Sequence, residues 1–137
     1  MSEPNPDTVR QPAIRVVMMP KETNALGTIF GGIILSYIDQ AGAVEAHRHG
    51  AGRLVTVAMR EVVFHQPVHV GDLVSFYTAT EKLGRTSVTV RVVVEAERQS
   101  GRQAHVRVKV TEAEVVYVHV DAQGQPTPIA PPQPDAP

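Results

Sequence analysis

The chain has 137 residues, enough for one domain with a buried core, and its 13 lysines and arginines nearly balance 14 aspartates and glutamates. The formal net charge of -1 gives no electrostatic basis for a nucleic-acid partner. Cysteine is absent, which excludes disulfides, thiolate nucleophiles and cysteine-ligated zinc.

Proline is concentrated at the two ends of the sequence. This composition predicts a disordered N-terminal tail over residues 1–12, a domain over 13–121 and a proline-rich C-terminal tail over 122–137. No apolar run approaches the roughly 18 to 20 residues of a membrane span. The N-terminus also lacks a basic region followed by an apolar one, so we expect a cytoplasmic protein without a secretory signal or a membrane partner.

The first predicted elements are a strand over residues 13–19, ended by Pro20, and a helix from about Gly31 to His49. Apolar residues surround most of this helix, which predicts a helix buried on nearly all sides. Gly42 lowers its helix propensity by roughly 1 kcal/mol, which suggests close packing against another backbone at that turn.

Everything after the helix is predicted to be strand, over residues 54–64, 73–80, 87–97 and 104–120, joined by short turns. Valines alternate with polar residues over 87–97, as expected for a strand with one buried face. Along 104–120 the apolar residues change parity near Glu112, which predicts a β-bulge. The fold class is therefore α+β, with an antiparallel five-stranded sheet wrapped around one long buried helix.

The helix and the loop before it carry the candidate chemistry. Gly31 and Gly32 open the helix, where unpaired N–H groups at the positive end of the helix dipole can stabilise an oxyanion. Asp39 follows Gly32 by about two turns and lies on nearly the same face. A lone acid on an apolar helix is costly to bury without a partner, so a functional carboxylate is the better interpretation than a structural one.

These residues and their order resemble the hotdog fold, and more specifically the YciA-like acyl-CoA thioesterases, relatives of the cytosolic acyl-CoA hydrolases. The resemblance covers roughly residues 13 to 130 and rests on the loop from Thr23 to Gly32, the helix bearing Asp39 and a later Phe…Pro-Val…Val-Gly-Asp segment. The supporting segments are Arg53-Leu54-Val55-Thr56-Val57, Gly84-Arg85-Thr86-Ser87-Val88, Thr111-Glu112-Ala113 and Tyr117-Val118-His119-Val120-Asp121.

The resemblance implies hydrolysis of acyl-CoA thioesters without a metal or covalent cofactor. It implies dimers whose sheets join edge to edge, commonly three to a hexamer as a trimer of dimers, with active sites shared between subunits. Asp39 would be the general base or nucleophile, and Gly31-Gly32 would supply the backbone donor at the thioester carbonyl. Asn24 would orient the water or the carbonyl from the neighbouring subunit.

The same resemblance assigns CoA contacts to Arg53, Thr56, Arg85, Thr86 and Ser87. Relatives often have a basic residue where this chain has Gln66, so the resemblance assigns no phosphate or interface contact to this position. Each of these positions also has a structural interpretation. Asn24 is a good turn residue, the threonines and Ser87 are ordinary in strands, and the arginines can be solvated.

Two alternatives to an acyl-CoA hydrolase stay open: a thioesterase for acyl-carrier-protein substrates and an acyl-CoA-binding protein without turnover. A metal site is not expected, because His47 and His49 lack the four-residue spacing that places two ligands on one helix face. Ser36 lacks the Gly-x-Ser-x-Gly context of a serine nucleophile.

Overall fold

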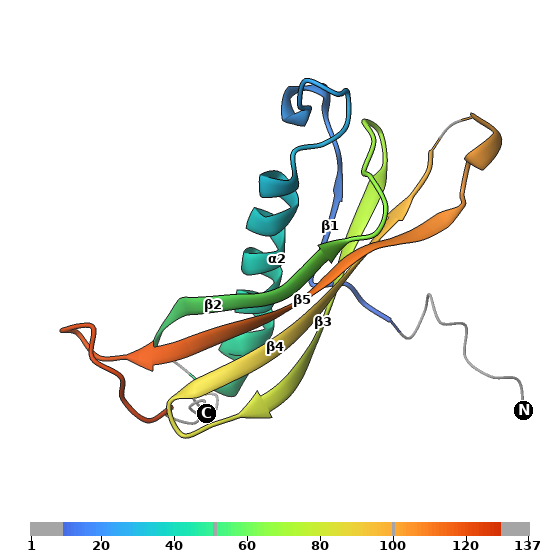
Figure 1. Ribbon diagram of the computed structural model, residues 1–137. Helices are drawn as coiled ribbons and strands as arrows, with labels where there is room; N and C mark the ends of the chain where they lie inside the picture. Colours follow the sequence, from blue (N-terminus) through green and yellow to red (C-terminus); the bar gives the residue numbers. More distant parts are fainter. Residues whose placement is uncertain (1–9, 51, 100, 130–137) are drawn as a thin grey trace, which may run out of the picture.

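The computed structural model describes residues 10–50, 52–99 and 101–129. The main helix is α2 (Gly31–Ala46), and the strands are β1 (Ile14–Val17), β2 (Arg53–Phe64), β3 (Leu73–Leu83), β4 (Ser87–Glu97) and β5 (Arg107–Val120). Three short 3-10 helices complete the list: η1 (Pro20–Glu22), η2 (His47–His49) and η3 (Gly101–Gln103). The described chain is thus α+β, as predicted, and the sheet curls around α2 (Figure 1).

The strand order in the antiparallel sheet is β1-β3-β4-β5-β2. The expectation that neighbouring strands in sequence are joined by simple turns is wrong for β2, which pairs with β5 at one edge instead of with β3. The segment from His65 to Asp72 carries the chain across to β3. Long-range pairing decides this choice, and local turn residues do not encode it.

A buried ion pair anchors this crossing segment. Arg98 at the end of β4 donates through Nη1 to Asp72, and both side chains are almost fully buried. Arg98 Nη2 also donates to the Pro67 carbonyl at 3.1 Å, while Asp72 Oδ2 accepts the His69 N–H at 2.8 Å. A paired and hydrogen-bonded charge is what burial at this position requires.

The two predicted sequence patterns in β4 and β5 are confirmed. Val88, Val90, Val92 and Val94 are fully buried against α2. In β5 the register shifts between Val94–Thr111 and Glu95–Lys109, which leaves Val110 as the extra residue of a bulge. Val110 and Thr111 are both fully buried, so the bulge moves the inward face from one parity to the other.

Helix α2 is buried on one side only, which corrects the expectation of burial on nearly all sides. Its buried residues are Ile34, Ile38, Ala41, Gly42 and Ala46, whereas Val44 is 47% exposed. Gly42 does pack closely, but against the Tyr117 side chain and not against a backbone: a Cβ there would lie 2.2 Å from the tyrosine oxygen. An apolar helix side open in one chain is a candidate interface.

The chain continues to contact the domain beyond the predicted boundary at residue 121. Thr127 N–H donates to the His119 carbonyl at 2.9 Å, and Ile129 N–H donates to the Arg85 carbonyl at 3.0 Å. Of the tails predicted over residues 1–12 and 122–137, residues 1–9 and 130–137 lie outside the described residues. No helix in the described ranges is both long enough and apolar enough to cross a membrane.

Candidate functional site

Asp39 lies in the middle of α2, half-buried, and faces strands β2 and β5. The Thr56 hydroxyl donates to its carboxylate Oδ1 at 2.6 Å. The Tyr117 hydroxyl donates to the main-chain carbonyl of the same residue at 2.7 Å. One helical residue is therefore held through its side chain by β2 and through its backbone by β5.

Thr56 reaches Asp39 because of the geometry of the β2 edge. Thr56 and Tyr117 are direct partners in the β2–β5 ladder, so their side chains project from the same face of the sheet. The register shifts directly after this pair, which makes Val57 the extra residue of a bulge. Bulges re-aim neighbouring side chains, and this one lies beside the residue that bonds the carboxylate.

The carboxylate has no cationic partner in the described part of the chain, and its hydrogen bond there, from Thr56, engages Oδ1 and not Oδ2. The Tyr117 phenol beside it is 1% exposed. Burial first, and then the negative charge of Asp39, raise the pKa of Tyr117, so the phenol stays protonated and remains a donor. The arrangement leaves Asp39 oriented but with one oxygen available to accept a proton.

Gly31 and Gly32 form the first turn of α2. Phe30 precedes them in an extended conformation, with φ -54° and ψ 131°, and Ile33 N–H donates back to the Phe30 carbonyl at 3.1 Å. Within the described chain nothing accepts a hydrogen bond from the N–H groups of Gly31 or Gly32. They are the unpaired donors expected at a helix start.

A cleft of about 330 Å³ opens beside this first turn. It lies between the helix start, the end of β2 and the segment that crosses to β3, and most of its walls are apolar. Its lining residues are Ile29, Gly31, Ile34, Phe64, His65, Gln66, Pro67 and Val68. Sequence reasoning did not identify this cleft, because Phe64 and Gly31 are brought together only by the fold.

The two candidate chemical elements do not meet within one chain. Gly32 and Asp39 are seven residues apart, which is about 10 Å along the helix axis. Strand β2 runs antiparallel to α2, so Thr56 lies beside Asp39 whereas the Phe64 ring lies 3.5 Å from a Cβ built on Gly31. The cleft therefore adjoins the helix start, and the carboxylate lies farther along the same side of the helix.

Asn24 is engaged within its own loop. Its Oδ1 accepts the Leu26 N–H at 2.9 Å and the Thr28 N–H at 3.2 Å, and its Nδ2 donates to the Thr28 hydroxyl at 3.0 Å. These bonds are those of a turn residue. Its expected role toward water or a carbonyl from a neighbouring subunit stays a prediction.

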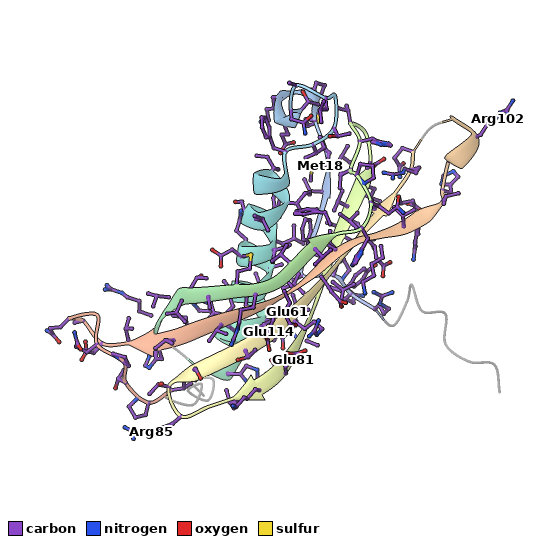
Figure 2. The ribbon with its side chains drawn as sticks, in the orientation of Figure 1. Met18, Glu61, Glu81, Arg85, Arg102 and Glu114 are labelled. Carbon is purple, nitrogen blue, oxygen red and sulfur yellow. The ribbon has the colours of Figure 1, made fainter. Side chains whose placement is uncertain are left out.

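The residues expected to contact CoA are gathered at one end of the sheet, apart from Thr56. Arg53 pairs with Val120 and Ser87 pairs with Val118, so the start of β2 and the start of β4 flank the end of β5. Arg85 and Thr86 lie in the adjoining turn. Figure 2 shows Arg85 at the tip of this end of the sheet and Arg102 at the opposite end.

No cluster of three or more His, Asp or Glu side chains suited to a metal ion is present within residues 10–50, 52–99 and 101–129. Two of the histidine rings near the end of α2 bond to other groups. His47 contacts the Ala43 carbonyl at 2.7 Å, and His49 contacts the Thr80 hydroxyl at 2.7 Å. The candidate chemistry of this site therefore rests on Asp39, whose Oδ1 is held by the Thr56 hydroxyl and whose Oδ2 is available to accept a proton.

Comparison with known proteins identifies the family. The thioesterase superfamily matches residues 26–103. The acyl-CoA thioester hydrolase YciA of Salmonella typhimurium is 40% identical over 116 residues, covering 85% of this chain and 87% of the relative. A hexameric hotdog-fold thioesterase of Campylobacter jejuni is 43% identical with a TM-score of 0.81, covering 87% of this chain and 90% of that one.

A second solved relative is a hexameric broad-specificity acyl-coenzyme A thioesterase, in a variant with one aspartate replaced by alanine. It superposes with a TM-score of 0.83 at 36% identity, covering 88% of this chain and 87% of that one. The sequence match and the architecture agree, and the chain belongs to the thioesterase superfamily and has its hotdog fold.

Proposed function

We propose that this protein is an acyl-CoA thioesterase that hydrolyses acyl-CoA to a free acid and CoA, with Asp39 as the general base. The observation that carries the proposal is the Asp39 carboxylate, which has Oδ1 fixed by Thr56 at 2.6 Å and no cationic partner among the described residues. The relatives named as acyl-CoA thioester hydrolases support the choice of substrate.

In the proposed reaction, Asp39 Oδ2 accepts a proton from water as the water oxygen attacks the thioester carbonyl carbon. The negative charge that develops on the carbonyl oxygen is stabilised by backbone N–H groups of Gly31-Gly32. The C–S bond then breaks, and the proton passes to the departing thiolate to give CoA. If Asp39 acts as nucleophile instead, its carboxylate attacks the carbonyl carbon, the C–S bond breaks to release the CoA thiolate, and the resulting mixed anhydride is hydrolysed by water.

The helix geometry supports a site whose two groups come from different copies of the chain. The base must lie within hydrogen-bond reach of the attacking water, and the oxyanion donors within about 3 Å of the carbonyl oxygen. A separation of about 10 Å along one helix is too long for one thioester carbonyl. Asp39 of one protomer and Gly31-Gly32 of its partner therefore form the proposed site.

The β2 edge offers the surface for such pairing. Its outer side has no strand partner among the described residues, and it exposes Val57 (55%) and Val63 (57%). Two copies of β2 joined antiparallel about a two-fold axis bring the Thr56 end of one strand near the Phe64 end of the other. Asp39 then approaches the partner's Gly31 and the cleft beside it.

The proposed assembly is this dimer, repeated three times in a hexamer as a trimer of dimers. The hexameric state of the relatives from Campylobacter jejuni and Yersinia pestis supports it. The Arg53 and Arg85 guanidiniums, together with Thr86 and Ser87, are proposed to contact the CoA phosphates and pantetheine. In the proposed reaction CoA is part of the substrate, and no separate cofactor takes part.

The test is the rate of thiol release from a panel of acyl-CoA thioesters by wild type and by Asp39→Asn, which preserves the shape of the side chain. We expect kcat to fall by a factor on the order of 10² to 10⁴. The matched control is Glu45→Gln on the same helix, where Glu45 accepts the Thr80 hydroxyl at 2.8 Å. Its kcat should stay near that of wild type.

The other outcomes of this assay discriminate the alternatives. Wild-type turnover by Asp39→Asn would reject the mechanism. Saturable acyl-CoA binding without thiol release by the wild-type protein would indicate a binding protein, and much faster hydrolysis of an acyl-carrier-protein thioester would reassign the substrate. After a single turnover in ¹⁸O-water, label in Asp39 would indicate the nucleophilic route, in which water attacks the Asp39 carbonyl carbon of the anhydride; the base route places label only in the released acid.

A further inference from the structure

Tyr117 is the largest fully buried side chain in the described core, and its hydroxyl bonds to the turn that bears the proposed base. The acceptor is the main-chain carbonyl of Asp39, at 2.7 Å. That carbonyl lies inside a regular helix, where its own i+4 N–H already satisfies it. For the carbonyl the bond to Tyr117 is therefore an additional one, while for the buried phenol it supplies the acceptor that the hydroxyl needs.

Gly42 shows that the helix is adapted to this contact. A Cβ at Gly42 would lie 2.2 Å from the Tyr117 oxygen, 3.0 Å from Cζ and 3.1 Å from Cε2. Any side chain there would push the phenol away from Asp39. A glycine in a helix interior costs about 1 kcal/mol of stability relative to alanine, so the close approach is maintained against helix propensity.

The contact fixes the distance between the helix and the sheet at the turn of the carboxylate. Thr56 and Tyr117 are cross-strand partners on β2 and β5, and both hydroxyls bond to Asp39. Thr56 bonds the carboxylate itself and so turns the side chain. Tyr117 bonds the main-chain carbonyl of Asp39 and so fixes the position of the backbone from which the Asp39 side chain extends.

We infer that Tyr117 is a positioning residue for the base, and that the absence of a side chain at Gly42 leaves the room that the Tyr117 hydroxyl needs to reach Asp39. The inference rests on the proposed function of Asp39. A small displacement of a general base is costly, because about 1 Å of misplacement can lower a rate by about 100-fold. The phenol is suited to this role because burial raises the pKa of Tyr117, which keeps it a hydrogen-bond donor at every working pH.

Tyr117→Phe tests the inference by removing only the hydroxyl. We expect kcat for acyl-CoA hydrolysis to fall about tenfold or more while KM and the affinity for CoA stay unchanged, because the lost bond acts on the chemical step. The matched control is Tyr77→Phe, which removes a hydroxyl bonded to Arg15 at 3.3 Å on the outer face of the sheet. It should leave kcat unchanged.

Gly42→Ala tests the same contact from the helix side. In an otherwise wild-type chain, the Gly42→Ala methyl group clashes with the Tyr117 oxygen, so this variant should lower kcat by at least as much as Tyr117→Phe does. In the Tyr117→Phe background that oxygen is absent and the nearest atom is Cζ at 3.0 Å, so the same methyl should lower kcat further by a smaller factor. Such coupling is expected if the two residues act through one contact.

The outcomes separate failure of this inference from failure of the proposed function. If Asp39→Asn is inactive but assembled Tyr117→Phe turns over at the wild-type rate, the positioning role is wrong and the base remains. If Tyr117→Phe does not assemble and Gly42→Ala keeps the wild-type kcat, the hydroxyl is structural and the inference is overturned. If Asp39→Asn retains activity, the proposed function itself is rejected.

Discussion

The two faces of the sheet use polar groups in opposite ways. On the concave face, against α2, a few hydroxyls each serve one acceptor, as Thr56 and Tyr117 do at Asp39. On the convex face, Arg91 pairs with Glu81, Glu112 and Glu61 together. Figure 2 shows Glu61, Glu81 and Glu114 gathered near the middle of the sheet.

This difference teaches where a substitution should matter. A hydroxyl that is the single protein partner of a carboxylate oxygen or a carbonyl has no substitute when it is removed, so loss of one concave-face group changes geometry at the site. Partly exposed ion pairs that share one guanidinium are screened by water and replace one another. Activity should depend on the concave face, and the convex face should contribute little beyond solubility and small increments of stability.

After Asp39→Asn, the largest effect is expected at the helix start, where Gly31→Pro removes a single N–H. Proline is tolerated at the first helical position, and Phe30 already has the extended conformation that a following proline requires. Deleting one oxyanion donor should lower kcat by roughly 10² to 10³.

Gly31→Ala is the matched control for this change. It keeps the N–H, and its Cβ would make an ordinary contact with the Phe64 ring at 3.5 Å. We expect thiol release near the wild-type rate. Equal loss of kcat in the alanine and proline variants would mean that bulk in the cleft, and not the donor, is responsible.

A smaller effect is expected for Thr56→Val, which removes the hydroxyl from Asp39 Oδ1 but keeps a similar shape. A hydrogen bond to a charged group contributes about 1.5 to 3 kcal/mol, so kcat should fall by roughly 10- to 100-fold. Thr80→Val is the control, since Thr80 makes the same kind of bond to Glu45 at 2.8 Å. Steady-state kinetics in which both variants lose kcat equally would refute the special role of Thr56.

The smallest effect is expected on the convex face. The Lys109 hydrogen bond, followed by the charges of Lys109 and Arg91, lowers the pKa of Glu112 below its ordinary 4.5. A carboxyl whose pKa is lower in the folded state stabilises the protein at pH values above its ordinary pKa. This stabilisation is lost as the pH falls through the folded-state pKa. Lys109→Met should therefore raise the pKa of Glu112 and lower Tm slightly at pH 7. At an acidic pH below both the folded-state and the unfolded-state pKa of Glu112, the substitution should not change Tm through this interaction.

The expected change in unfolding free energy is under about 1 kcal/mol, with kcat unchanged. A side-chain NMR titration of Glu112 measures the pKa directly, with Lys82→Met as a control lysine elsewhere on the sheet. A large loss of activity in Lys109→Met would contradict the division between the two faces.

The sequence predicted local features well because local periodicity encodes them. The valine alternation of β4 and the parity change of β5 correspond to the buried face and to the bulge at Val110. Gly42 was a correct sign of close packing, but its partner is Tyr117, which is 75 positions later in the chain and whose hydroxyl bonds to Asp39.

What the sequence could not predict depends on pairing over long distances. Strand β2 lies beside β5, and a bulge at Val57 follows the residue that meets Asp39. Thr56 was expected at CoA from the family resemblance, and no spacing rule in the sequence connects it with the carboxylate. The exposed apolar side of α2 cannot be understood from a single chain, because we propose that a second copy of the chain packs against it.

The central claim, a base from one protomer and oxyanion donors from its partner, is tested most directly by subunit complementation. Asp39→Asn and Gly31→Pro proteins are each purified, mixed under conditions that exchange subunits, and assayed for thiol release. In a mixed dimer one of the two sites then has both wild-type groups, so activity should return well above either parent. If mixing restores no activity although mass spectrometry detects mixed oligomers, both groups belong to one chain and the shared site is wrong.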